Sequence, residues 1–376
     1  MKGRAAHAPV IVGGGLAGGA AALRLAQCGR APLLLERQGT PHDKVCGEFL
    51  SVEAARHLAA LGVDVRALGG APIHTVRLRV GGRRAQAPLP FMATGLTRHT
   101  LDAALLEAAR RAGAAVEQGA RVLRLEPGGA TGRAVLATGT THAAPLLLAT
   151  GKHDLAGHPR DPRGTVHDLV GFKQYWRATP ALRQALEGVV EVVAFDGGYA
   201  GVQLVEGGRV NLCLLLARAR LQALGGDWDG VSRALQREPA LRWMDSAEPL
   251  LPRPLAISNV PYGYLAPSHP LDGIFRLGDQ AAVIPSFCGD GMAIALHSGR
   301  LAADLLDEGA SAADFQGALR RDVARQVRLA MGVQRVARTR WGPLALVAGF
   351  GALPGALGAL ARLTRVPPAA VARTGA

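Results

Sequence analysis

The hydrophobic pattern at the start of the chain predicts a strand, a helix and a second strand. Residues 9–12 are a short apolar run that ends in glycines, residues 16–27 have the pattern of a helix, and residues 32–36 form a second apolar run. A strand–loop–helix–strand unit of about 30 residues is the signature of a parallel sheet. The chain therefore opens on a βαβ unit.

Further helices are expected at 51–61, at 97–112 and at 291–306. Ser51 can cap the first of them. In the second, Leu101 and Leu105 fall on one face, as in an amphipathic helix. Short apolar runs separated by glycine turns fill residues 115–150, and two buried strands are expected at 145–150 and 273–277.

Between residues 166 and 260 the pattern changes to strands joined by short turns. Gly-rich turns at 196–198 and 206–209 are typical of hairpins, which indicates an antiparallel sheet inserted into the first fold. The predicted strands are residues 73–80, 171–176, 189–195, 199–205 and 210–216.

The expected fold class is therefore α/β: a Rossmann-like domain, an inserted antiparallel β-sheet domain and a C-terminal helical segment. The first domain is discontinuous in sequence. The predicted boundaries are 1–70, 96–165 and 262–330 for the Rossmann-like domain, 71–95 and 166–261 for the inserted domain, and 331–376 for the C-terminal segment.

The stretch 341–363 is almost uncharged but is interrupted by Pro343, Pro354 and several glycines. A membrane span needs about 20 apolar residues in an unbroken helix. We expect two short packed helices here, and a contact with a bilayer or a lipophilic tunnel is the alternative.

The first candidate site is the loop Gly13-X-Gly15-X-X-Gly18. Gly13 permits a tight turn, Gly15 lets the backbone approach a pyrophosphate, and Gly18 lets the helix pack closely on the strand. Glu36, 23 residues after Gly13, is placed to bind a ribose 2′-hydroxyl. This arrangement predicts a dinucleotide-binding site.

A second cluster, far downstream, indicates which dinucleotide is bound. Gly278 and Asp279 end a predicted strand, where the carboxylate can accept hydrogen bonds from ribitol hydroxyls, and NAD has no ribitol. Gly289 and Gly291 begin the next helix, whose amides can stabilise negative charge on the pyrimidine edge of a flavin. The pair of clusters indicates FAD.

Charge and cysteine content narrow the classes of partner. The net charge is +14, and only Lys2, Lys44, Lys152 and Lys173 of the 43 basic residues are lysines. Such a field favours anionic partners, either a phosphorylated nicotinamide cofactor or an acidic membrane surface. The arginines are dispersed, which argues against nucleic acid.

Four widely spaced cysteines argue against a disulfide framework or a metal site.

The residues quoted above resemble the FAD-dependent oxidoreductase superfamily that contains para-hydroxybenzoate hydroxylase and geranylgeranyl reductases. The resemblance covers most of the chain. Its matching segments are GGGLAGGAAALRLAQCGRAPLLLER at the start, TRHTLDAALLEAARRAGA in the middle and RLGDQAAVIPSFCGDGMAIALHSG near the end.

The resemblance implies roles for several further residues. Arg98 would lie beside the cofactor and Pro285 near the reactive flavin edge. Residues 44–51 are similar to a loop that runs past the isoalloxazine in geranylgeranyl reductases and flavin halogenases. In that loop Cys46 is either a functional thiol or a small filler, and the same alternatives hold for Cys288.

The predicted sites can now be given in full. The expected catalytic residues are Pro285, Cys46 and Tyr199, with Gln203 as a second candidate to face the substrate. No metal ligand is expected. The expected cofactor-binding residues are Gly13, Gly15, Leu16, Ala17, Gly18, Glu36, Arg37, Cys46, Gly47, Arg98, Val122, Gly151, Gly278, Asp279, Pro285, Gly289, Gly291 and Met292.

The chain also departs from the family. The Trp-X-Trp-X-Ile motif of flavin halogenases is absent, and so is the hydroxylases' Asp-Gly motif after the third Rossmann strand. The expected electron donor is NADPH or NADH. The residues that would either bind its phosphate or form a solvated basic loop are Lys152, His153, His158, Arg160 and Arg163.

The favoured function is an FAD-dependent monooxygenase that hydroxylates a lipophilic phenolic or polyketide-like substrate through a flavin C4a-hydroperoxide. That chemistry needs an apolar, water-excluding cavity, which Val, Leu and Ala of the inserted sheet would roof. The alternatives are a reductase of isoprenoid or other alkene double bonds and a flavoprotein that transfers electrons or matures a partner.

The N-terminus has no apolar leader, so the cytoplasm is expected, with membrane association through residues 341–363 as the alternative.

Overall fold

A five-stranded parallel sheet forms the centre of the first domain in the computed structural model, which describes residues 8–270 and 272–375. Its order is β17 (Phe275–Arg276), β10 (Leu146–Leu148), β1 (Val10–Val12), β2 (Leu33–Glu36) and β6 (Ala115–Gln118). The three central strands are almost wholly apolar, as expected where both faces of a sheet are covered. The βαβ prediction is confirmed.

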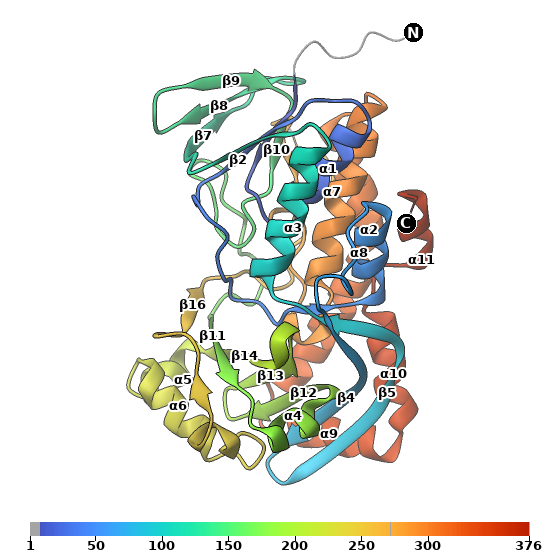
Figure 1. The fold of residues 1–376 in the computed structure, drawn as a ribbon. Helices are drawn as coiled ribbons and strands as arrows, with labels where there is room; N and C mark the ends of the chain where they lie inside the picture. Colours follow the sequence, from blue (N-terminus) through green and yellow to red (C-terminus); the bar gives the residue numbers. More distant parts are fainter. Residues whose placement is uncertain (1–7, 271, 376) are drawn as a thin grey trace.

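Helices pack together on one side of this sheet (Figure 1). Small residues let them approach closely: a Cβ on Gly299 would lie 2.3 Å from the carbonyl oxygen of Ala17. The expected helices are all present. They are α1 (Leu16–Gln27), α2 (Val52–Ala60), α3 (Arg98–Arg111) and α7 (Gly291–Asp307). The longer α8 (Ala312–Ala337) was not predicted, and it runs without a break across the expected domain boundary at residue 330.

A small antiparallel sheet packs on the other side and stands at the top of Figure 1. It consists of β7 (Val122–Glu126), β8 (Gly132–Leu136) and β9 (Thr141–Ala144). Its apolar residues share one buried cluster with Val10, Val12 and Leu35 of the parallel sheet.

The inserted segments build one nine-stranded sheet at the bottom of Figure 1. All its neighbours are antiparallel except β12 and β4, which pair in parallel and join the two inserted segments. Its strands are β3 (Phe49–Leu50), β4 (Ala71–Val80), β5 (Arg83–Gly95), β11 (Leu169–Arg177), β12 (Gly188–Phe195), β13 (Gly198–Leu204), β14 (Arg209–Ala217), β15 (Glu248–Pro249) and β16 (Leu255–Ser258).

Strand alternation divides the centre of this sheet into two different faces. One face is apolar and packs on α4 (Pro180–Leu186), α5 (Arg218–Ala223) and α6 (Trp228–Gln236). The opposite face, which looks toward the first domain, is largely polar. In register across β11, β14 and β13 it carries Lys173, Cys213 and Gly201 in one row and Tyr175, Asn211 and Gln203 in the next.

The C-terminal stretch forms short helices, as the proline pattern predicts. They are α9 (Gly342–Ala352) and α10 (Pro354–Leu363), which pack along β5, and α11 (Pro368–Arg373), which contacts α2. Within the described residues no single helix has the length and apolarity of a membrane span, although Gly342–Ala352 and Gly355–Arg373 meet that test as a pair bent by 113°.

Candidate functional site

The three glycines of the Gly13-X-Gly15-X-X-Gly18 motif, at the junction of β1 and α1, are each required for a different structural reason. Gly13 has φ +110°, and a Cβ on it would lie 2.4 Å from the carbonyl oxygen of Ala149. A Cβ on Gly18 would lie 1.9 Å from the carbonyl oxygen of Gly13. Both glycines are therefore required by the fold itself.

Gly15 is different, because the space beside it is bounded by cations. It precedes Leu16 and Ala17, the first residues of α1, and a Cβ on it would lie 3.3 Å from Arg98 Nη2 and 3.8 Å from Lys44 Nζ. Helix amides on one side and two cations on the other make a cradle for a pyrophosphate.

Asp102 positions both cations. It accepts two bonds from Arg98, at 2.8 and 2.9 Å, and one from Lys44 at 2.7 Å. Burial alone would raise the pKa of Asp102, but the charges of Arg98 and Lys44 outweigh it and hold that pKa below its usual value. The sequence analysis included Arg98 and missed Lys44, whose place next to Gly15 depends on a contact between residues 58 positions apart.

Glu36 lies at the mouth of a cavity of about 350 Å³ beside the glycine loop. Its carboxylate accepts hydrogen bonds from the amides of Gly14 (2.6 Å) and Gln38 (2.9 Å). The cavity is also lined by Gly14, Lys44, Asp102, Arg110 and Gln118. We expect this cavity to take the adenosine half of a dinucleotide.

Two predicted cofactor residues lie at the edges of this space. Arg37 is exposed directly after Glu36. Val122 is buried in the apolar cluster with Val12 and Leu35, so its side chain serves packing. A cofactor contact at Val122 stays a prediction, and only its backbone is available to make it.

The second predicted cluster lies next to the first, although 260 residues separate them in sequence. Gly278 has φ +56°, and a Cβ on it would lie 3.1 Å from the Cβ of Ala17 on the first turn of α1. Asp279 follows in a short 3-10 turn, and Gln280 Nε2 donates to the carbonyl oxygen of Gly151 at 2.8 Å. The site is assembled from three distant parts of the chain.

The loop of residues 44–48 is held by an unusual set of bonds. Each of its five successive carbonyl oxygens accepts a hydrogen bond from a side chain. The donors are Lys173 to Lys44 (3.1 Å), Lys152 to Val45 (2.6 Å), Asn211 to Cys46 (3.3 Å) and Gly47 (2.8 Å), and Gln203 to Glu48 (2.8 Å). Four of these five bonds come from the polar face of the large sheet, so that face holds the loop.

Glu48 completes this attachment from the loop side. It adopts φ +58° and is fully buried, and its carboxylate lies 2.5 Å from Lys173 Nζ. It also accepts bonds from the Tyr175 hydroxyl (2.8 and 2.9 Å) and the Arg98 amide (2.8 Å). The sequence analysis missed Lys173 and Tyr175 because both lie within an ordinary strand pattern.

On the other side of the site, Tyr199 reaches the predicted flavin-edge segment. Its hydroxyl lies 2.8 Å from Ser286 Oγ and accepts a bond from the Phe287 amide at 3.1 Å, and the Tyr262 hydroxyl lies 3.4 Å from the same Ser286 oxygen. Burial raises the pKa of both tyrosines, and for Tyr262 the charge of Lys152 opposes that rise. Both hydroxyls are therefore protonated at neutral pH.

Residues 285–292 form the edge of the site. Pro285 is buried, Gly289 has φ +68°, and a Cβ on Gly289 would lie 2.6 Å from the ring of Phe49. Gly291 begins α7, and Met292 is buried behind it. The geometry leaves the first amides of α7 free to meet an anionic ring edge.

The two cysteines of interest belong to different surroundings. Cys46 Sγ accepts a bond from the Glu48 amide at 3.4 Å, whereas burial raises the pKa of Cys288 to about 12. All four cysteines are free thiols. A role for Cys46 beyond filling the loop stays a prediction.

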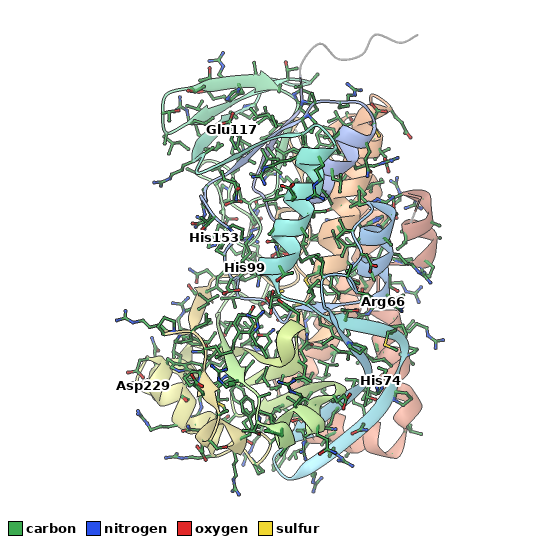
Figure 2. All side chains as sticks on the ribbon, in the orientation of Figure 1. Arg66, His74, His99, Glu117, His153 and Asp229 are labelled. Carbon is green, nitrogen blue, oxygen red and sulfur yellow. The ribbon has the colours of Figure 1, made fainter. Side chains whose placement is uncertain are left out.

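The basic segment 152–163 is only partly solvated, and a donor site built from it stays a prediction. Lys152 donates to the carbonyl oxygen of Val45, His158 to that of Leu125, and Arg160 is buried against Asp154. Only two of the five basic residues are exposed, Arg163 and His153, and Figure 2 labels the latter between the small sheet and the large one.

Together these residues fit FAD. Gly15 leaves a backbone cradle facing Arg98 and Lys44, Glu36 borders a cavity next to it, and Gly278, which precedes Asp279, approaches the first turn of α1. These contacts to the cofactor remain predictions for each residue.

Comparison with known proteins agrees with this assignment. Residues 7–146 match a family model described as an FAD binding domain. The menaquinone reductase of Mycolicibacterium smegmatis is 29% identical over 326 residues, which cover 80% of this chain and 76% of that protein.

Solved structures share the fold at low sequence identity. A triple mutant of the flavin-dependent brominase Bmp2 superposes with a TM-score of 0.77 at 16% identity, covering 95% of this chain and 94% of that one. Pseudomonas aeruginosa PqsL in complex with 2-aminobenzoylacetate gives a TM-score of 0.71 at 16% identity, covering 91% and 99%.

A valine at Gly15 should abolish cofactor binding without unfolding the protein. The free space beside Gly15 ends at Arg98 and Lys44, so the side chain would occupy the place of the pyrophosphate. The purified Gly15→Val variant should be colourless but keep the circular dichroism of the wild type. Gly39→Val, at an exposed glycine with nothing within 4 Å, should stay yellow. A yellow Gly15→Val variant would contradict the assignment.

Removing Lys173 should destabilise the protein strongly. Lys173→Met leaves the Glu48 carboxylate buried without its cation, which costs about 3–5 kcal/mol. The double variant Glu48→Gln/Lys173→Met removes both charges and should recover at least half of that loss, measured by urea unfolding. If the double variant is no more stable than Lys173→Met, the pair does not act as a unit.

Proposed function

We propose that this chain, an FAD-dependent oxidoreductase of the para-hydroxybenzoate hydroxylase and geranylgeranyl reductase-like superfamily, reduces a carbon–carbon double bond in a lipophilic isoprenoid-bearing substrate. Electrons come from NADPH or NADH by way of the flavin. The proposal selects the reductase over the hydroxylase that the sequence pattern favoured.

One observation carries this choice: the roof of the site is polar. Most of the Val, Leu and Ala residues of the inserted sheet turn away from the loop of residues 44–48 and pack on α4, α5 and α6, whereas Leu169 and Leu215 pack beside Tyr199 and Tyr262. Lys173, Tyr175, Gln203 and Asn211 face the loop of residues 44–48 in their place. A cavity that must protect a labile oxygen adduct from protons is expected to be apolar.

A reductase uses protic groups, because each hydride it adds to one carbon must be matched by a proton on the neighbouring carbon. Bound FAD would supply the hydride. Tyr199 and Tyr262 meet at Ser286 and hold the proton that completes the reduction. The positive charge of Lys152 opposes the rise in the pKa of the Tyr262 hydroxyl and so favours release of its proton.

The relatives support the class of substrate. The name menaquinone reductase, borne by the Mycolicibacterium smegmatis protein, describes reduction of a prenylated quinone, a lipid with both a quinone ring and an unsaturated chain. We assign the reduction to the unsaturated prenyl chain of the substrate and not to its quinone ring. A quinone ring would accept electrons without a proton donor held at one carbon, and therefore would not require the tyrosine–serine cluster.

We further propose that the protein meets its substrate at a membrane through α9 and α10. Trp341, Leu353 and Leu363 are 64%, 67% and 53% exposed, and Met92 of the neighbouring β5 is 51% exposed. The guanidinium of Arg340 lies 5.0 Å from the ring centre of Trp341, so cation and aromatic ring stand together as in an interfacial anchor.

Anaerobic turnover separates the candidate reactions. With the flavin reduced by dithionite and oxygen removed, a prenylated quinone should gain two hydrogens that subsequent ferricyanide oxidation does not remove, as detected by mass spectrometry. A product that forms only in air and carries an added oxygen would establish the hydroxylase instead. Because dithionite also reduces a quinone ring directly, a product that ferricyanide converts back to substrate would place the reduction on the ring only if it forms faster with the protein than without it. No turnover in either condition would favour an electron-transfer or maturation flavoprotein.

In the same assay Tyr199→Phe and Tyr262→Phe should each lower kcat by about 100-fold with little change in KM, since each loses only a hydroxyl. Tyr264→Phe is the matched control, because the hydroxyls bonded to Ser286 belong to Tyr199 and Tyr262, and this dithionite assay uses no nicotinamide donor. Unchanged kcat in both site variants would remove the tyrosines from the mechanism.

The membrane contact is tested by sedimentation with vesicles that contain anionic phospholipid. Wild-type protein should sediment with them, and Leu353→Ser/Leu363→Ser should not. Leu123→Ser, at an exposed leucine of the small sheet, should behave as the wild type. Wild-type protein that stays in solution would contradict the contact.

A further inference from the structure

A second and larger cavity is lined in part by residues 263–265, which follow Tyr262 of the tyrosine–serine cluster in sequence. Its volume is about 810 Å³, and α8 and the segments 159–165 and 263–270 enclose it. Backbone hydrogen bonds hold the segment 263–266 of its lining in place. The Gly263 amide donates to the Val283 carbonyl oxygen at 2.8 Å, and the Ala266 amide donates to that of Ala281 at 2.7 Å. The charged residues that line it are Arg163, Arg276, Arg320, Arg328, Arg335, Asp161, Asp272 and His269.

The two carboxylates are already engaged. Asp161 pairs with Arg163 at 2.6 Å and Asp272 with Arg276 at 2.7 Å. Among the described residues, no carboxylate lies within ion-pair distance of Arg320, Arg328 or Arg335 on α8. Arg338, just beyond the end of α8, is by contrast bidentate to Asp168 at 2.8 and 2.7 Å. An excess of three positive charges therefore gathers at this cavity.

The three arginines form a stripe along one side of α8. At 1.5 Å per residue, Arg320 and Arg335 stand about 22 Å apart along the helix axis, with Arg328 between them. Arg320 is also fixed in orientation, because its Nη1 donates to the carbonyl oxygens of Leu265 (3.2 Å) and Ala266 (2.7 Å). Its remaining guanidinium donors are free for an anion.

The rest of the lining is apolar or aromatic, with Tyr264, Leu265, Val327 and Met331 among its residues. Such a mixture suits a ligand that carries anionic groups on a flat or apolar body. Arg328 and Arg335 stand about 10 Å apart along the helix axis, which suits two phosphate groups on one nucleotide, as at the adenosine end of a phosphorylated dinucleotide.

We propose that this cavity binds a phosphate-bearing nucleotide, namely the adenosine-phosphate end of NADPH. The inference rests on the proposed function in one respect, that a nicotinamide donor reduces the flavin. The donor gives up one hydride, which carries two electrons and a proton, and leaves as NADP⁺, so no further co-reactant is required. The arginine stripe would favour NADPH over NADH.

The test is direct binding of 2′,5′-ADP to the flavin-loaded protein by isothermal titration calorimetry. Wild-type protein should bind it, and Arg328→Gln/Arg335→Gln should bind it at least about tenfold more weakly, because charge-assisted hydrogen bonds are lost. The KM for NADPH should rise by a similar factor. Arg321→Gln/Arg325→Gln is the matched control, since both residues are exposed on the same helix, lie outside the cavity and remove the same charge.

Three results would overturn the proposal. The first is no binding of 2′,5′-ADP, and the second is equal weakening of its binding in both double variants. The third is binding of glycerol phosphate in place of 2′,5′-ADP. The last would assign the same phosphate chemistry to a lipid headgroup. Turnover of wild-type protein with dithionite needs no nicotinamide donor. A protein that fails there fails the proposed function, whereas one that succeeds there but does not bind 2′,5′-ADP fails only this inference.

Discussion

The attachment of the loop of residues 44–48 to the large sheet is the constraint on which the site depends. A fully buried Glu48–Lys173 pair joins the two, and every carbonyl oxygen from Lys44 to Glu48 accepts a side-chain bond. Two charges removed from water are tolerated only when their remaining hydrogen-bonding capacity is met, and here Tyr175 and a backbone amide meet it. The same loop carries Lys44, so the network that holds the roof also sets one wall of the pyrophosphate cradle.

This attachment explains why one sheet can serve two purposes. Alternation sends the aliphatic side chains into the cluster with α4, α5 and α6, where their burial stabilises the inserted domain. The intervening positions are then available for polar residues that would be costly in a core but are satisfied by the loop carbonyls. A polar roof and a well-packed domain are thus compatible within the same strands.

The arginines of this chain show a related division of labour. Some are held in place by partners within the fold: Arg98 is positioned by Asp102, and Arg160 by Asp154 and nearby carbonyl oxygens. Others, on α8, lack carboxylate partners among the described residues and gather at one cavity. The net charge of +14 only implies a positive electrostatic field around the protein. The pairing of arginines with carboxylates in the fold decides which arginines remain available to bind an anion.

Local patterns in the sequence determined the βαβ unit, the inserted sheet, the short C-terminal helices and the FAD-binding class, because strand period, glycine spacing and proline position act over a few residues. They also predict cofactor roles for Gly15 and Asp279, whose chemistry is tied to strand ends. They did not determine which residues of the sheet face the loop of residues 44–48, and aliphatic side chains such as Leu169 and Leu215 form only the part of the roof beside Tyr199. Lys173, Tyr175, Gln203 and Asn211 acquire their roles from partners more than 120 residues away, at loop carbonyls that no pattern identifies. Only the tertiary structure brings those carbonyls and side chains together.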